Sequence, residues 1–293
     1  MDSWSTVRTD LALEARECVD EKAEGLHGVT VEEAYDEPGD VHITKVVIET
    51  KNGAKMLGKP MGTYITLEAP TMTEPEEGYH QEISDVLARE LHGVLPDPDR
   101  EQSILVVGLG NREVTADSLG PNVVDNLLVN RHIVREYGKV AYNRSKMHQI
   151  SSLVPGVMAK TGMESAEIIR GVIGETKPDM VIVIDALAAR STKRLNRTIQ
   201  ITNTGIHPGS GVGNHRNAIT QESLSVPVLA LGVPTVVDAA TIVGDAMGER
   251  PVALKELNNM YVTTKDVDQQ IQQISHIICD GINKALNCEE DMA

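Results

Sequence analysis

The sequence contains no phenylalanine, and aromatic residues make up only 2% of its 293 residues. So few rings leave little material for the stacking platforms with which proteins bind single-stranded nucleic acids. Hydrophobic residues nevertheless make up 41% of the chain, which is enough for a substantial core. That core must be built from Val, Ile, Leu, Met and Ala.

Cysteine is also scarce, and Cys18, Cys279 and Cys288 form no CxxC pair. This pattern argues against a disulfide framework and against a structural zinc site. The first residues, MDSWSTVRTDLALEARE, lack the apolar stretch of a signal peptide. No window approaches the ~18 continuous apolar residues of a membrane span. We therefore expect a soluble, cytoplasmic protein.

Basic residues are outnumbered, with 27 Lys and Arg against 43 Asp and Glu, which gives a formal net charge of −16. A field of this sign repels nucleic acids and anionic lipid surfaces. The composition therefore predicts neither a nucleic-acid partner nor a membrane partner.

The N-terminal part contains two segments, residues 42–50 and 62–69, that resemble β-strands. Lys51-Asn52-Gly53 after the first segment is a turn signal. We expect an added β-hairpin region over about residues 40–70. Residues 76–95 place apolar side chains at helical spacing, and Pro96 follows them.

From about residue 101 to 293, buried strands alternate with helices. The sequence predicts strands over 103–110, 179–190, 197–204 and 225–234, and helices over 121–133, 163–176, 235–247 and 266–288. Such alternation indicates an α/β fold with a mostly parallel central sheet flanked by helices.

Two aspartates follow the apolar runs of this predicted sheet. Asp117 lies in the segment after the run 103–110, and Asp185 follows Met180–Ile184. If the two strands are neighbours, both carboxylates lie at one edge of the sheet and converge on one water molecule. Close carboxylates do not both ionise easily, so one acts as a base and the other as an acid in amide hydrolysis. The structural alternative is that each aspartate caps a helix or turn.

Glycine-rich segments suggest other sites. Gly108-Leu109-Gly110 follows a strand, but Glu113 stands where a dinucleotide fingerprint has a small residue, and no P-loop is present, so we expect no cofactor. Residues 206–216 contain Gly209, Gly211 and Gly213, which allow close approach to a ligand. His207 and His215 flank these glycines. We expect a wall of the substrate site here and no metal.

Several segments together resemble the germination proteases of spore-forming bacteria. They keep the family's order from residue 7 to about 242 and include VRTDLALEA, ILVVGLGNREVTADSLGP, HQISSLVPGVMAKTGMES, KPDMVIVIDALAAR, HPGSGVGN and LALGVPTVVDAATI. The core is also similar to the phosphorylase/hydrolase-like core of the hydrogenase-maturation endopeptidases.

The resemblance implies an atypical aspartic-type endopeptidase whose two carboxylates fall on Asp117 and Asp185. Such enzymes initiate degradation of the small acid-soluble proteins that coat DNA in the spore core. They are homotetramers made as self-processing zymogens. The implied cut lies between Asp10 and Leu11, which divides the chain into a propeptide, residues 1–10, and a single protease domain, residues 11–293.

A basic pocket that reads the acidic residue before the cut would provide specificity. Arg112, Arg190, Lys193 and Arg194 are candidates, with ordinary surface solvation as the alternative. Two other functions stay open at this point. One is a nickel-sensing endopeptidase like those of hydrogenase maturation, and the other is a non-catalytic peptide-binding module that uses the loop 209–213.

Overall fold

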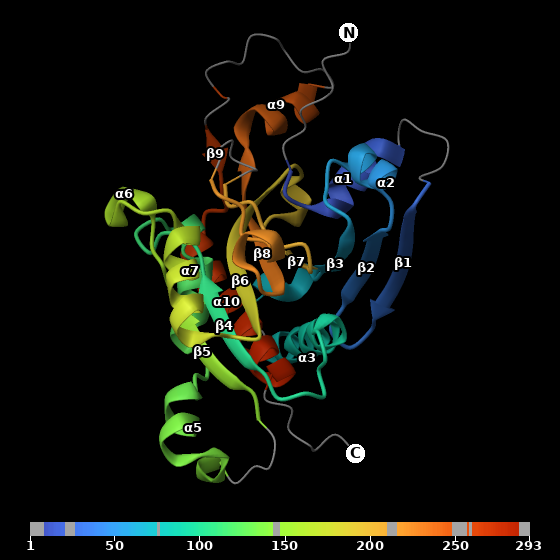
Figure 1. Ribbon diagram of the computed structural model, residues 1–293. Helices are drawn as coiled ribbons and strands as arrows, with labels where there is room; N and C mark the ends of the chain where they lie inside the picture. Colours follow the sequence, from blue (N-terminus) through green and yellow to red (C-terminus); the bar gives the residue numbers. More distant parts are fainter. Residues whose placement is uncertain are drawn as a thin grey trace.

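A mixed β-sheet runs through the molecule (Figure 1). The structure is a computed structural model, and it describes residues 9–20, 27–74, 77–142, 147–209, 216–247, 257 and 260–286. Over these residues the sheet has nine strands in the order β1-β2-β3-β7-β8-β6-β4-β5, and β9 pairs with β8. The strands are β1 Val29–Asp36, β2 Val41–Ile48, β3 Gly62–Glu68, β4 Ser103–Gly108, β5 Gln149–Leu153, β6 Met180–Ala189, β7 Thr198–Thr202, β8 Val228–Asp238 and β9 Tyr261–Val262.

The parallel part of the sheet consists of β5, β4, β6 and β8. Strands β4 and β6 are direct neighbours, with Gly108 opposite Ile184. Both are almost wholly buried, as expected of parallel strands covered on both faces. The structure thus confirms an α/β fold with a large central sheet, and the predicted strands 103–110 and 179–190 lie side by side.

The antiparallel part consists of β1, β2, β3 and β7, and it joins the parallel part where β7 pairs with β8. The expected pairing of the two N-terminal strands is present, but the prediction of a turn at Lys51-Asn52-Gly53 was wrong. These residues begin helix α2, Lys51–Leu57. Thr50 caps this helix by accepting a hydrogen bond from the Gly53 amide, and Gly58 ends it in the left-handed conformation.

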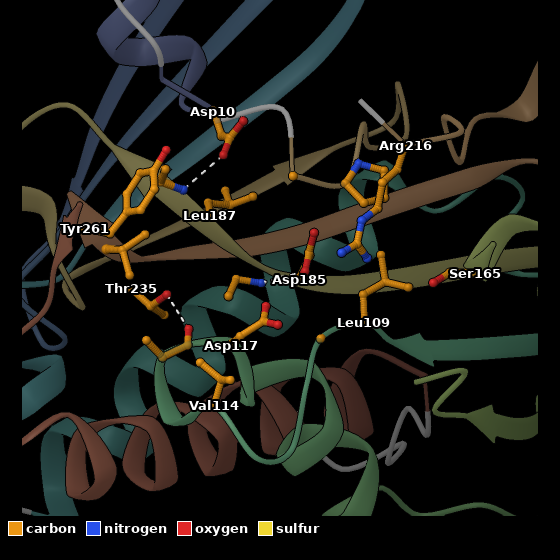
Figure 2. Close-up of a pocket in the computed structure, with 17 residues that line it drawn as sticks. Asp10, Leu109, Val114, Asp117, Ser165, Asp185, Leu187, Arg216, Thr235 and Tyr261 are labelled. Carbon is orange, nitrogen blue, oxygen red and sulfur yellow. Dashed lines mark hydrogen bonds between the residues drawn. The ribbon is translucent and has the colours of Figure 1, made fainter. Parts of the chain in front are cut away.

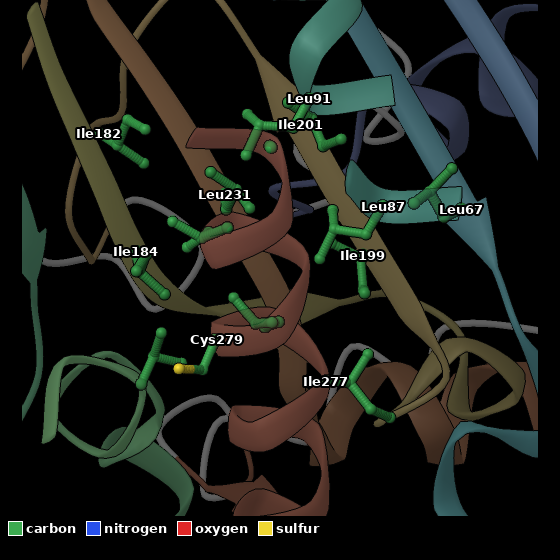
Figure 3. Packing of buried hydrophobic residues seen from close by; sticks show 14 of the residues in the cluster. Leu67, Leu87, Leu91, Ile182, Ile184, Ile199, Ile201, Leu231, Ile277 and Cys279 are labelled. Carbon is green, nitrogen blue, oxygen red and sulfur yellow. The ribbon is translucent and has the colours of Figure 1, made fainter. Parts of the chain in front are cut away.

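Helices cover both faces of the sheet. One face carries α3, α4 and α10, and their apolar side chains form the largest core cluster with the strands. Figure 3 shows Ile277 and Cys279 of α10 among aliphatic side chains of the sheet. A second cluster packs α7 against the opposite face of β4 and β6. The helices not yet given are α1 Ala12–Asp20, α3 Glu77–Val94, α4 Leu119–Asn126, α5 Arg131–Tyr137, α6 Met158–Thr161, α7 Ser165–Thr176, α8 Gln221–Leu224, α9 Ala239–Met247, α10 Val267–Leu286 and the short 3-10 helices η1 Pro70–Thr73, η2 Thr115–Asp117, η3 Lys139–Tyr142 and η4 Thr192–Arg194.

The helix predicted over residues 121–133 is divided into α4 and α5. Asn130 lies between them, where its side-chain oxygen accepts a hydrogen bond from the Ile150 amide at 2.7 Å and its side-chain nitrogen donates to the His148 carbonyl at 2.9 Å. These bonds hold the segment between α4 and α5 against β5. The polar sequence QISSL had not indicated this strand. Within the described part of the chain, no helix is both long and apolar enough to cross a membrane.

Candidate active site

The two aspartates lie where β4 ends beside a longer β6. Asp185 belongs to β6, and Asp117 ends η2 in the loop that follows β4. This loop folds back so closely that a Cβ on Gly110 would lie 2.0 Å from the Asp117 carbonyl oxygen. Gly110 also has a φ of +119°, so only glycine fits here without strain. The hydroxyl of Thr235 fixes the loop from β8 by donating to the Ala116 carbonyl at 2.6 Å.

Both carboxylates line one cavity of about 290 Å³ (Figure 2). Arg216 and Asp10 line the same cavity. The other lining residues come from the loop after β4, from the start of α7, from β6, β8 and β9, and from the segment after β7: Leu109, Gly110, Val114, Ala116, Ser165, Ala186, Leu187, Ala188, Pro208, Gly209, Thr235, Val236 and Tyr261. Asp117 and Asp185, which come from different segments of the chain, thus line the same cavity.

The two carboxyl groups have different surroundings. Asp185 is only 6% exposed, and burial together with the negative charges of Asp117 and Asp10 raises its pKa well above the usual range. Asp117 is less buried, and burial raises its pKa to a smaller extent. The positive charge of Arg216 opposes both increases. Asp185 therefore holds its proton more firmly than Asp117, which is the division of roles that acid–base catalysis needs.

The capping alternative accounts for these aspartates only in part. The N-cap of α4 is Ser118, which makes no side-chain capping bond, so Asp117 does not cap that helix. Asp185 accepts a local hydrogen bond from the Ala186 amide at 3.0 Å. This local bond alone does not offset the cost of burying the carboxyl group, so capping does not account for the position of Asp185.

The segment around Asp10 packs against the end of β6. The Asp10 amide donates to the Ala188 carbonyl at 3.1 Å, and the Asp10 carboxylate accepts from the Ala188 amide at 2.9 Å. Leu11 is fully buried and packs in a cluster that includes Leu187 and Val237. The peptide group between Asp10 and Leu11 is thus held at the border of the aspartate cavity.

Two side chains bind the backbone of this segment. The ammonium of Lys59, in the connection between α2 and β3, donates to the carbonyl oxygens of Asp10 at 2.8 Å and Thr9 at 3.1 Å. The side chain of Gln200, on β7, donates to the Asp10 carbonyl at 3.2 Å and accepts from the Ala12 amide at 2.7 Å. Gln200 therefore forms hydrogen bonds with the backbone on both sides of the Asp10–Leu11 bond.

The predicted basic residues do not lie at this cavity. Arg112 forms a two-pronged ion pair with Asp125 on the surface, and its side chain is half exposed. Arg190 lines a separate surface cleft beside α1 and β2. Arg194 pairs with three carboxylates, and Lys193 is exposed on η4.

The structure describes residues 206–209 and 216 of the glycine-rich segment. Gly209 lines the aspartate cavity, and His207 lines a smaller adjoining cavity with Lys59 and Gln200. Gly211, Gly213 and His215 lie outside the described residues. Over the part of the chain that is described, no three His, Cys, Asp or Glu side chains are grouped to hold a metal ion.

Four residues of this region were missed in the sequence. Arg216 directly follows the HPGSGVGN segment and a histidine, so its place in that segment was an available signal. No local sequence signal indicated Lys59, Gln200 or Thr235, because pairings between distant segments bring these residues to the site.

Comparison with known proteins adds to this geometry. The sequence model of the germination protease family matches residues 7–249. The germination protease of Caldanaerobacter subterraneus subsp. tengcongensis is 43% identical and aligns with 96% of this chain and 94% of its own length. The germination protease of Clostridium perfringens (strain ATCC 13124) is 42% identical, with 96% and 95% covered.

Among solved structures, the [NiFe] hydrogenase maturation protease HycI from Thermococcus kodakarensis KOD1 aligns with 66% of this chain and 99% of its own. The TM-score is 0.35 and the identity is 14%. The family match and the identity to full-length relatives lead to one conclusion. The chain belongs to the germination protease family and is a spore protease.

Proposed function

We propose that this protein is an aspartic-type endopeptidase in which Asp117 and Asp185 activate the attacking water. We further propose that it is made as a zymogen that cuts itself between Asp10 and Leu11. The observation that carries both proposals is the single cavity that Asp117, Asp185 and Asp10 line together.

The different surroundings of the two carboxyl groups support a division of labour. Asp117, the more easily ionised group, takes a proton from water while the water oxygen bonds to the carbonyl carbon. Asp185, which keeps its proton, passes it to the nitrogen as the C–N bond breaks. The products are a carboxyl group and an amine, and the proton taken up by Asp117 then returns to Asp185.

The hydrogen bonds on the Asp10 carbonyl favour hydrolysis of that peptide group. Negative charge develops on the carbonyl oxygen as water adds, and preorganised donors stabilise it. Lys59 and Gln200 are such donors in self-processing. The Ala188 amide, which binds the Asp10 carboxylate, favours an acidic residue before the cut.

The substrates that we propose are the small acid-soluble proteins that coat DNA in the spore. The protease would act as a homotetramer in the core of the developing and germinating spore and begin their degradation during germination. Residues 1–10 would be the propeptide, and residues 11–293 would form a single protease domain.

The test is to follow purified protein by intact mass and then to add a small acid-soluble spore protein. We expect a new N-terminus at Leu11 and cleavage after acidic residues of the substrate. Asp117→Asn and Asp185→Asn should each lower both reactions by at least about a thousandfold, as expected for residues that act as one unit. Asp125→Asn, on the surface of α4, is the matched control and should leave both unchanged.

Near-normal cleavage by either aspartate variant would rule out the carboxylate pair. Digestion that stops with EDTA and returns with nickel would favour the nickel-sensing alternative. Light scattering of the processed protein tests the tetramer, and a monomer would contradict it.

A further inference from the structure

We propose that Glu14 binds the new N-terminus that forms when the chain is cut before Leu11, and so locks the processed segment onto the strand that carries Asp185. The inference rests on the proposed cut between Asp10 and Leu11. It assigns a role to a buried carboxylate that the hydrolysis itself does not use.

Glu14 is 2% exposed, which is unusual for a carboxylate. Its two oxygens accept hydrogen bonds from the backbone amides of Arg190 at 2.7 Å and Ser191 at 3.0 Å, directly after β6. The guanidinium of Arg194 lies 3.5 Å from the Glu14 carboxylate. Glu14 therefore joins the first turn of α1 to the end of the strand that carries Asp185.

A single hydroxyl separates Glu14 from the nitrogen of Leu11. The Leu11 amide donates to the Thr9 hydroxyl oxygen at 3.1 Å, and that hydroxyl donates to a Glu14 oxygen. Thr9 thus occupies the space between the nitrogen and the carboxylate. Hydrolysis before Leu11 separates Thr9 from the rest of the chain.

The position of Glu14 in its helix allows direct contact once Thr9 has left. Leu11 is the residue before the first residue of α1, and its carbonyl accepts from the Ala15 amide at 3.2 Å. Glu14 is then the third helical residue, whose side chain characteristically reaches back to the nitrogen of the capping residue. The cut converts that nitrogen from an amide into an ammonium, and a buried carboxylate is a strong acceptor for it.

Burial of Leu11 keeps the new ammonium in place. The Leu11 side chain is fully buried among apolar residues of β6 and β8, which would hold the processed end where it was before the cut. Of the described residues, the charged groups near this point are Glu14 and Arg194, together with Asp10, which precedes Leu11, and Lys59, which binds the Asp10 carbonyl from the connection between α2 and β3. An ammonium in this place replaces the lost hydroxyl as donor to Glu14.

The test uses the full chain after processing, with the Leu11 amine as reporter. Cyanate carbamylates only uncharged amines, and mass spectrometry of the N-terminal peptide gives the rate. At pH 7 we expect the Leu11 amine to react ~10-fold more slowly than the same amine in the free peptide LALEA, a factor that corresponds to one unit of proton affinity. Glu14→Gln should remove this protection, and Glu17→Gln, on the same helix, should retain it.

Three results separate the possibilities. Processing that yields no Leu11 N-terminus contradicts the proposed function and the inference with it. A Leu11 N-terminus that reacts as fast as the free peptide overturns the inference alone. If Glu14→Gln does not fold or is not processed, the comparison of the unsubstituted processed chain with the free peptide still decides.

Discussion

The side-chain nitrogen of Lys59 lies 2.8 Å from the carbonyl oxygen of Asp10, which belongs to the peptide group that we propose is cut. Burial lowers the pKa of this ammonium, and the negative charges of Asp10 and Glu14 oppose that change. A cation held in this way serves the reaction better than a mobile surface lysine, since it is already in place when charge develops on the oxygen.

Lys59→Met should therefore slow self-processing by about a hundredfold, the usual loss when one donor to a developing oxyanion is removed. The rate is measured by intact mass over time. Lys55→Met, on the exposed side of α2, is the control and should process at the normal rate. An unchanged rate in Lys59→Met would show that the ammonium only supports the fold.

Asp185→Asn should abolish cleavage and yet stabilise the fold at neutral and higher pH. The folded protein raises the pKa of Asp185, so this carboxyl group stabilises the fold most at pH values below the ordinary aspartate pKa. Its contribution to stability is lost as pH rises from there through the folded-state pKa. Asparagine does not ionise and avoids this loss.

We expect the melting temperature of Asp185→Asn to exceed that of the parent by a few degrees at about pH 8 and to match it near about pH 4. Scanning calorimetry across this range measures the difference. A constant difference at every pH would mean that ionisation of Asp185 is not its cause.

Arg216→Gln should shift the pH dependence of cleavage to higher pH on both limbs. The positive charge of Arg216 lowers the pKa of Asp117 and of Asp185, so its removal raises both. The profile of kcat/KM against pH reports these two groups in the free enzyme. Arg112→Gln, whose partner is Asp125 on the surface, should leave the profile where it was. A profile that stays in place or moves to lower pH would contradict the electrostatic effect of Arg216 on the two carboxyl groups.

Gly110→Ala should impair both stability and cleavage. The added Cβ would meet the Asp117 carbonyl oxygen at a backbone φ that favours glycine, so the loop with Asp117 must move. Such strain costs about 1–3 kcal/mol. Gly171→Ala on the exposed side of α7 meets nothing within 4 Å and should instead stabilise the chain by about 0.5–1 kcal/mol. Denaturant unfolding and cleavage of a spore protein measure the two effects.

Strands β4, β6 and β8 of the parallel part could be predicted from the sequence because they are continuous apolar runs between glycine, proline and polar residues. Strand β5 could not, because its sequence QISSL is largely polar. Strand β1 could not, since it lies at the edge of the sheet and its sequence VTVEEAYD is largely exposed. The start of α2 was misread because glycine after asparagine also signals a turn, and the Thr50 cap decided for a helix.

The residues of the site likewise differ in whether they could be predicted from the sequence. Asp117 follows β4 and Asp185 lies within β6, and both strands are recognisable as apolar runs, so the geometry of parallel sheets predicts that the two residues lie near each other. Lys59 and Gln200 come from the antiparallel part, and their approach to Asp10 depends on the pairing of β3 with β7 and of β7 with β8. The spacing of residues within one segment does not show which distant strand that segment pairs with.

The carboxylate of Asp10 is a third acid near Asp185, and it contributes to the proton affinity of that group. Departure of residues 1–10 after the proposed cut would withdraw this charge and let Asp185 ionise at lower pH. We therefore expect cleavage of substrates by the processed enzyme to decline at a lower pH than self-processing does. The same site would then have different pH ranges for its two reactions.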